Sequence, residues 1–383
     1  MRVEYDPSMP ETSHVGALVA AMDAIAPPEF AEPWDNTGLL LGLSEDPVSR
    51  VMLCIDLTDA VVDEAIRREV DAIVAYHPPI FTPRTSITDA DSGGARLLGL
   101  ARAGIAVHSP HTAADAAIGG VNDWLLEVLG AVSGTAVRAG RSLRPSERFK
   151  IVTFTPAEAA ESIRKALSES GAGRIGDYDQ CSTAIDISAT FRGGEDTNPV
   201  VGIAGRLERV AEVRLEMVCG AECLGDALAA VRRTHPYEEP PIEVHGLEPQ
   251  PTPRIGAGRL GTLEPGATTA ELVDRLRAGL GSDRFTLHEP RSRRRHRLVG
   301  LCAGSGGELL DAAIDRGCTA FVTGELKHHD VLAAASRGCA VVLAGHTNTE
   351  RGWLKVLRKR LRQALPGVTF ELSRSDTDPL RTV

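Results

Sequence analysis

Long apolar runs alternate with amphipathic segments along the first third of the chain. A run without polar alternation is typical of a strand covered on both faces, and such runs predict buried strands at 51–57, 71–76 and 105–109. Apolar residues with helical spacing predict helices at 16–27, 59–70, 94–104 and 120–130. We expect Thr58 or Asp59 to cap the second of these helices.

The last third of the chain repeats this pattern. It predicts strands at 297–304, 319–324 and 340–345, and helices at 307–317, 331–338 and 349–365. Strands that alternate with helices in this way predict an α/β fold, with a mostly parallel sheet core flanked by helices.

The middle of the chain has a different order of elements, between two linker-like segments at 138–150 and 248–266. Its pattern predicts strand, helix, strand, strand, helix and strand, which is the order of a ferredoxin-like α+β fold. We therefore expect this module to be inserted into the α/β domain. The expected boundaries are 1–145 and 249–383 for the two halves of the α/β domain, and 146–248 for the insert.

Charge narrows the classes of function. The 383 residues carry a formal net charge of −10, which disfavours binding to nucleic acid. A basic stretch, RSRRRHR at 291–297, is the local exception. Because no aromatic residue interleaves with its arginines, we interpret it as a solvated loop rather than a nucleic-acid surface.

Cysteine usage and the lengths of the apolar runs bear on location. The seven cysteines are scattered and no two are spaced as CxxC, so a reduced chain is favoured over a disulfide framework. The N-terminal residues MRVEYDPSMPETS lack the apolar stretch of a signal peptide. No run approaches the roughly 18 apolar residues of a membrane helix. The sequence therefore predicts a cytoplasmic protein without a membrane segment.

Histidines and carboxylates follow four of the predicted strands. Ligands bind at the carboxyl ends of strands in open parallel sheets, so residues that follow different strands are expected to meet at one edge. The residues in these positions are His77, His111, Asp115, Glu325, His328, His329, Asp330, His346 and Glu350. Imidazole and carboxylate ligands without thiolate suit Zn²⁺, Mn²⁺ or Fe²⁺, and a bridging carboxylate would allow one or two ions per chain.

The alternatives differ among these residues. A single histidine after a strand is more often a hydrogen-bonded loop residue, and Glu350 alone could stabilise the first turn of a helix. However, His346 and Glu350 are four residues apart and can face one point from a helix. The joint pattern favours a metal site formed by His77, Asp115, His346 and Glu350, followed by His111. The weaker candidates could instead cap a surface helix: Glu325, His328 and His329.

Three further motifs have two interpretations each. GSGG at 304–307 either exposes backbone N–H groups to an anion or makes a tight turn from strand to helix, and the turn is the commoner case. WDNTGLLLG at 34–42 places Asp35 and Asn36 either in a turn over Trp34 or in the lining of the cleft. HPYEEP at 235–240 has a histidine and two carboxylates, but its prolines favour a turn that ends a helix.

These motifs together resemble one known family. WDNTGLLLG, YHPPIF, HTAADAAIGGVND, GSGG, TGELKHHD and GHTNTERG are similar to motifs of the Nif-three-like dinuclear metal-centre proteins, also called GTP cyclohydrolase I type 2 homologues. The resemblance extends over nearly the whole chain. The middle module is similar to the PII/CutA-type insert of the longer bacterial members, with GAGRIGDYDQCS, TNP and HPYEEPPIEV. It implies two metal ions in an α/β core and a homohexamer built as a trimer of dimers.

The resemblance also implies residue roles. It places metal ligands at His77, Asp115, His346 and Glu350, with Glu350 bridging the ions, and His111 at a further position of the cleft. Tyr76 is a departure, since many bacterial members have a second histidine at this position. A phenol with a reference pKa near ~10 is a poor ligand, so we expect an asymmetric pair of sites.

Two functions of different classes follow. The first is a metal-dependent hydrolase of a nucleotide-like or phosphate-bearing substrate, with Tyr76, His111 and Glu325 as candidates for proton transfer. The family name implies opening of the GTP ring, but the sequence shows no base-recognition site. The second is a non-enzymatic protein that buffers metal or acts as a regulatory scaffold, in which the PII-like insert serves sensing or assembly. A ring that binds nucleic acid through 291–297 is disfavoured by the net charge.

Overall fold

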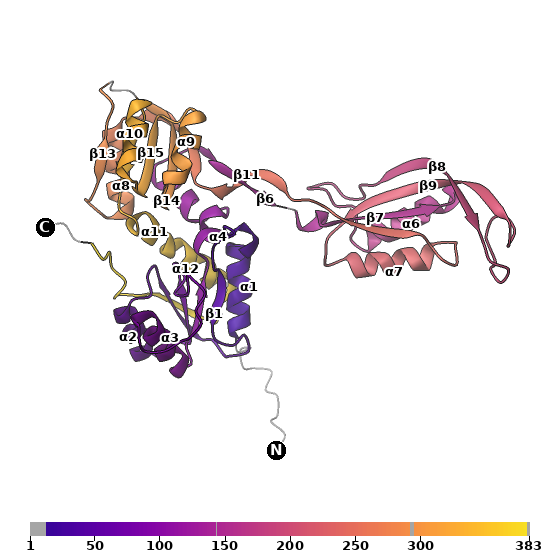
Figure 1. Cartoon of the computed structure of the whole chain (residues 1–383), viewed down its shortest axis with the longest axis horizontal. Helices are drawn as coiled ribbons and strands as arrows, with labels where there is room; N and C mark the ends of the chain where they lie inside the picture. The colour runs from indigo at the N-terminus through magenta and orange to yellow at the C-terminus, as the bar shows by residue number, and fades with distance from the viewer. Residues whose placement is uncertain (1–12, 143, 292–294, 381–383) are drawn as a thin grey trace, which may run out of the picture. The chain divides into compact units, whose positions relative to one another are not determined.

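The computed structural model describes residues 13–142, 144–291 and 295–380. Two predictions from the sequence fall partly on residues outside these ranges. The N-terminal segment without a signal peptide includes residues 1–12, and the basic stretch interpreted as a solvated loop includes residues 292–294. The chain divides into two compact units (Figure 1). Unit 1 comprises Met1–Arg141 together with Pro251–Val383, and unit 2 comprises Ser142–Gln250.

Unit 1 contains a five-stranded sheet whose inner strands are buried on both faces, as their apolar runs predict. Its strand order is β1 (Gly38–Leu41), β4 (Ala106–Ser109), β3 (Ala72–Ala75), β2 (Arg50–Cys54) and β17 (Thr369–Leu372). Helices α2 (Asp59–Arg67) and α3 (Ser92–Arg102) lie side by side over its outer face (Figure 1). The hydroxyl of Thr58 caps α2 by accepting a hydrogen bond from the backbone N–H of Val61, which confirms the predicted cap.

A six-stranded sheet forms the other part of unit 1. Its strand order is β13 (Thr286–His288), β16 (Ala340–Leu343), β15 (Ala320–Glu325), β14 (His296–Ser305), β12 (Arg259–Ala267) and β5 (Ser133–Thr135). Helices α9 (Gly307–Asp315) and α10 (His328–Ser336) cover its outer face through a second apolar cluster. Strands β6 (Arg138–Ser142) and β11 (Gln250–Ala257) form a separate two-stranded sheet.

The largest apolar core of unit 1 joins residues of both sheets. The helices that contribute to it are α1 (Val15–Ile25), α4 (His111–Ala116), α5 (Val121–Val128), α8 (Thr269–Leu280) and α12 (Trp353–Ala364). The helix predicted at 349–365 is interrupted at Gly352, between α11 (Asn348–Arg351) and α12, where a Cβ atom would lie 2.0 Å from the ring of Trp124. No helix in the described ranges combines the length and the apolar character needed to cross a membrane.

The prediction of a mostly parallel sheet is wrong, because both sheets of unit 1 are mixed. In the first sheet, β1 runs antiparallel to β4, while the other pairings are parallel. In the second sheet, β14, β15 and β16 are parallel, whereas β12, β5 and β13 add antiparallel pairings. Continuous apolar runs identify the buried central strands, but they do not specify the direction of the strands added beside them.

Unit 2 has the elements that its sequence pattern predicts. They are β7 (Phe149–Thr155), α6 (Ala157–Glu169), β8 (Thr183–Arg192), β9 (Leu207–Cys219), α7 (Leu224–Thr234) and β10 (Ile242–Gly246). The strand order is β10-β7-β9-β8, and all three pairings are antiparallel. Both helices pack against the sheet through one apolar core that includes Ile151, Leu215 and Val231. Two short 3-10 helices complete the described elements, one at Pro28–Phe30 in unit 1 and one at Pro145–Glu147 in unit 2.

Candidate metal centre

Three side chains from separate elements meet in unit 1. His77 follows β3 of the first sheet, His346 follows β16 of the second, and Glu350 lies in α11. The Nε2 atom of His77 is 3.6 Å from Oε2 of Glu350, and Nε2 of His346 is 3.3 Å from Oε1 of Glu350. Within the described part of the chain, no other group of three His, Cys, Asp or Glu side chains brings its ligand atoms within 4.8 Å of one another.

Carboxylates fix the orientation of both imidazole rings. The Nδ1 atom of His77 is 2.9 Å from Oδ1 of Asp56, which lies just beyond β2. The Nδ1 atom of His346 is 3.0 Å from Oε1 of Glu325, the last residue of β15. Because Nδ1 of each ring is engaged, Nε2 is the atom directed at Glu350. Partners of this kind commonly orient the histidines that bind metal ions.

Glu350 is the buried member of the group, with 3 % of its surface exposed. Its Oε2 atom has no hydrogen-bond partner among the described residues, since Nε2 of His77 is too distant at 3.6 Å. Burial raises the pKa of Glu350, but its contacts with His346 and His77 outweigh burial and lower the pKa. An ionised and incompletely paired carboxylate beside two imidazoles fits a divalent cation.

Two glycines allow the backbone to approach this group closely. Gly304 has a φ angle of +62°, and a Cβ atom there would lie 2.7 Å from Oε1 of Glu350 and 3.1 Å from Nε2 of His346. At Gly324, a Cβ atom would lie 2.6 Å from the Cα atom of His346. The GSGG segment forms the turn from β14 to α9. Any side chain at position 304 would fill the space beside the ligand atoms.

Tyr76 and Asp115 form a pair behind this group. The hydroxyl of Tyr76 donates a hydrogen bond to Oδ1 of Asp115, and Tyr76 itself is fully buried. Burial, reinforced by the negative charges of Asp115 and Glu350, raises the pKa of Tyr76, so that the phenol stays protonated. Burial also raises the pKa of Asp115 to about 7. One oxygen of Asp115 is thus engaged by a phenol and not by an imidazole.

His111 faces the same cleft from the start of α4. Its ring centre is 5.4 Å from that of His77 and 5.9 Å from that of Tyr76. Its Nδ1 atom is 2.7 Å from Oδ1 of Asp35, and Oδ2 of Asp35 accepts a hydrogen bond of 3.1 Å from the backbone of Thr112. Asp35 therefore orients a cleft histidine, as Asp56 and Glu325 do for the other two.

The remaining candidates after β15 do not join the group. His328 and His329 are exposed at the start of α10. Asp330 accepts a hydrogen bond of 3.2 Å from the backbone N–H of Lys327, in the first turn of the same helix. These three residues therefore correspond to the alternative interpretation, the start of a surface helix.

The sequence also matches known proteins over most of its length. A family model described as Duf34/NIF3 (NGG1p interacting factor 3) matches residues 13–379. The chain belongs to the DUF34/NIF3 family. One DUF34/NIF3 relative, the GTP cyclohydrolase 1 type 2 homolog of Bacillus subtilis, is 32% identical over 369 residues, which are 94% of this chain and 96% of the relative. NIF3-like protein 1 of Mus musculus is 34% identical over 377 residues, which are 96% of this chain and 92% of the relative.

Solved structures of other proteins share the fold. A Bacillus cereus protein related to NIF3 aligns with a TM-score of 0.76 and 29% sequence identity, covering 98% of this chain and 100% of that protein. A Staphylococcus aureus protein aligns with a TM-score of 0.77 and 25% identity, over the same shares of both chains. The resemblance seen in the sequence motifs is therefore confirmed at the level of the family.

Asp56 is the residue at this centre that sequence reasoning did not identify. It lies near the end of the run VMLCIDL, which predicts a buried strand. The rule that identified His77, a polar residue at the carboxyl end of a strand, applies equally to Asp56. The other candidates are histidines or acids close to a histidine in the sequence, whereas Asp56 has no histidine near it.

Metal binding at this centre is expected to release about two protons per ion at pH 7. Burial lowers the pKa of His77, but contacts with Asp56 and Glu350 outweigh burial and raise the pKa to about 10. Contacts with Glu350 and Glu325 raise the pKa of His346 to about 9, despite partial burial. Both rings therefore carry a proton at pH 7 in the metal-free protein, and each must lose it to present Nε2 to an ion.

The sign of this pH dependence follows directly. The folded-state pKa values are raised, so the ion pairs stabilise the metal-free fold below about pH 6.5 and this stabilisation is lost as the pH rises through about 9 to 10. Metal affinity should change in the opposite direction, increasing with pH and levelling off above that range. Calorimetric titration in two buffers of different ionisation enthalpy measures the protons released, and binding without proton release would contradict the assignment.

Proposed function

We propose that this protein binds a divalent metal ion between His77, His346 and Glu350. The observation that carries the proposal is Oε2 of Glu350, a buried oxygen of an ionised carboxylate without a hydrogen-bond partner among the described residues. Three protein ligands leave coordination positions open, as in catalytic rather than structural zinc sites. Imidazole and carboxylate ligands without thiolate suit Zn²⁺, Fe²⁺ or Mn²⁺.

We propose that a second ion, held by Asp115 and a bridging Glu350, binds more weakly than the first. Tyr76 occupies one oxygen of Asp115 and, as a protonated phenol, offers no anionic ligand atom. The raised pKa of Asp115 adds a proton that a cation would have to displace. These features support the asymmetry expected from the sequence.

We propose that the centre hydrolyses a nucleotide-like or phosphate-bearing substrate. Support for the substrate class comes from the name of relatives, GTP cyclohydrolase 1 type 2 homolog. A bound divalent ion would act as a Lewis acid on an oxygen atom of water or substrate. His111, held at Nδ1 by Asp35, keeps Nε2 for proton transfer in the cleft. Tyr76 and Glu325 contact Asp115 and His346, so we assign them positioning roles.

A non-enzymatic role in metal buffering or as a regulatory scaffold is the second candidate. The observation that favours it is the protonated phenol of Tyr76, which weakens the case for two tightly bound ions. A single exchangeable ion would suit buffering better than two-metal hydrolysis.

We also propose that unit 2 is a ferredoxin-like insert, spanning about 146–248, between two halves of an α/β metal-binding domain. The order β-α-β-β-α-β and the antiparallel sheet support this assignment. Its PII/CutA-type character and assembly of the chain as a homohexamer, a trimer of dimers, are supported by the sequence resemblance. A cytoplasmic location is supported by the scattered cysteines.

The test is turnover by metal-loaded protein on a panel of nucleotides, including GTP, and simple phosphate esters. The hydrolase proposal predicts activity that is lost in His346→Ala and Glu350→Ala and retained in Glu308→Gln, whose side chain is 88% exposed. Activity that survives both alanine substitutions would contradict it. Reversible metal exchange without turnover on any member of the panel would favour the buffering role.

A further inference from the structure

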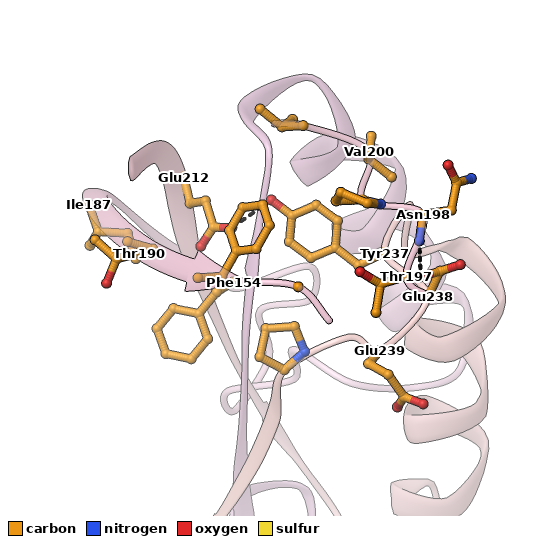
Figure 2. Close-up of a pocket in the computed structure, with 16 residues that line it drawn as sticks. Phe154, Ile187, Thr190, Thr197, Asn198, Val200, Glu212, Tyr237, Glu238 and Glu239 are labelled. Carbon is orange, nitrogen blue, oxygen red and sulfur yellow. Dashed lines mark hydrogen bonds between the residues drawn. The ribbon is translucent and has the colours of Figure 1, made fainter. Parts of the chain in front are cut away.

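Unit 2 contains a cavity of about 500 Å³ that plays no part in the proposed metal chemistry. Its lining comes from β7, β8, β9, the loop between β8 and β9, and the HPYEEP segment that follows α7 (Figure 2). Every lining residue belongs to unit 2. Small-molecule sites usually measure about 300–1,000 Å³, so the space is large enough for an organic ligand.

Aromatic and aliphatic side chains form much of the cavity wall. Phe154, Phe191 and Tyr237 contribute three aromatic rings, and Ile187, Val200 and Val201 contribute aliphatic surface. On β7, Ile151 packs toward the two helices, so Phe154, three positions later, belongs to the opposite face of the sheet. Aromatic faces attract cations as well as apolar groups.

The charged residues of the lining all have the same sign. Glu212, Glu238 and Glu239 line the cavity, and among the described residues no Lys, Arg or His side chain does. Glu212 lies on β9 and is 7% exposed. Its Oε1 atom accepts a 2.6 Å hydrogen bond from the hydroxyl of Tyr237 (Figure 2), whereas Oε2 accepts none from the described residues. A buried carboxylate with one oxygen available favours a cationic donor.

The basic residues close to this wall do not neutralise it. The guanidinium of Arg214 lies 5.8 Å from the ring centre of Phe154. However, Nε of Arg214 donates a 2.7 Å hydrogen bond to Glu216, whose other oxygen accepts one from Lys150 at 2.9 Å. Burial lowers the pKa of His235, which favours the neutral ring. Arg214 also shows that one face of Phe154 already packs against a cation.

We propose that this cavity binds a small organic cation, an ammonium group carried on an apolar or aromatic body. The ammonium group would pair with Glu212, and the body would pack among Phe154, Ile187 and the ring of Tyr237. An anionic ligand of the same size would instead meet three carboxylates. Tyr237 acts as a positioning residue that holds the Glu212 carboxylate, and burial raises its pKa so that the hydroxyl remains a donor.

Three probes of similar shape separate charge from size: phenethylammonium, phenethyl alcohol and phenylacetate. Each is titrated calorimetrically into the full chain and into the variants Glu212→Gln and Glu243→Gln. Glu243→Gln is the matched control, because Glu243 is exposed on β10 and lies outside the lining. Phenethylammonium should bind at least about tenfold more tightly than the alcohol, and phenylacetate should bind most weakly.

Glu212→Gln should lower the affinity for phenethylammonium about tenfold and leave the affinity for phenethyl alcohol within about twofold. Glu243→Gln should change neither affinity. Equal binding of the ammonium and the alcohol, tighter binding of phenylacetate, or no binding of phenethylammonium would overturn the proposal. If phenethylammonium does not bind, and sedimentation shows self-association that Val200→Asp abolishes, the cavity would be assigned to contact with a second copy of the chain. If Glu212→Gln does not fold, the comparison of the three probes on the unaltered chain still tests the proposal.

Discussion

Replacing Glu350 with glutamine is expected to lower the affinity for a divalent ion by at least about a hundredfold. Even a residue that only hydrogen-bonds to a metal ligand typically contributes a factor of about ten to a hundred to metal affinity. The glutamine side chain keeps the shape of glutamate but removes the only negative charge among the three converging groups. The two imidazoles would remain oriented by Asp56 and Glu325, so the loss isolates the contribution of the carboxylate. Competition with a metal-sensitive chelator dye measures the affinity.

Glu308→Gln is the matched control for this prediction, since it makes the same change of charge on a side chain that is 88% exposed. It should leave metal affinity unaltered. Equal affinity in Glu350→Gln and Glu308→Gln would remove Glu350 from the ligand set. Unfolding curves of both variants check that the fold is retained.

Replacing Arg259 with methionine is expected to lower the free energy of unfolding by about 3–5 kcal/mol, the usual consequence of breaking a buried ion pair. Arg259 is on β12, is 1% exposed and pairs with Asp123. Its guanidinium also donates hydrogen bonds to the backbone carbonyls of Gly256, Gly258, Ala116 and Ala117. Methionine fills a similar volume but removes the donor that Asp123 and these four carbonyl groups share, while Asp123 and Ala117 keep their hydrogen bonds from the backbone N–H groups of Gly119 and Gly120.

Urea denaturation of the metal-free protein measures this effect. Arg277→Met is the control, because Arg277 is 47% exposed and pairs with Asp274 and Asp283 at the surface. An exposed pair of this kind contributes about 1 kcal/mol or less. A loss below that value in Arg259→Met would contradict the prediction, because it would show that the contacts of Arg259 with the end of α4 contribute little to stability.

The sequence was sufficient to predict the central strands and the residues that follow them. Continuous apolar runs identify β2, β3, β4, β14, β15 and β16, because a strand covered on both faces has no polar alternation. The ends of those runs place His77 and His346 just past the carboxyl ends of two strands, where ligands bind in open parallel sheets. The four-residue spacing from His346 to Glu350 then placed both side chains near one point, as the structure shows.

Other features depend on long-range packing that a single sequence does not specify. The direction of β1, β12 and β13 is set by where the chain returns to the sheet, and their short sequences fit either direction. The hydrogen bond of Tyr76 to Asp115 joins residues 39 positions apart, and that of His77 to Asp56 joins residues 21 apart. In both cases the residue types were visible in the sequence, but their partners were set by the fold.

A crystal structure of the metal-loaded chain, with anomalous data collected at the absorption edge of the metal, tests the central claim most directly. The account predicts a strong anomalous peak bonded to Nε2 of His77, Nε2 of His346 and the carboxylate of Glu350. Any second peak near Asp115 should be weaker, with the hydroxyl of Tyr76 still directed at Asp115. No peak at the three ligand atoms, or two peaks of equal strength with Tyr76 turned away, would contradict it.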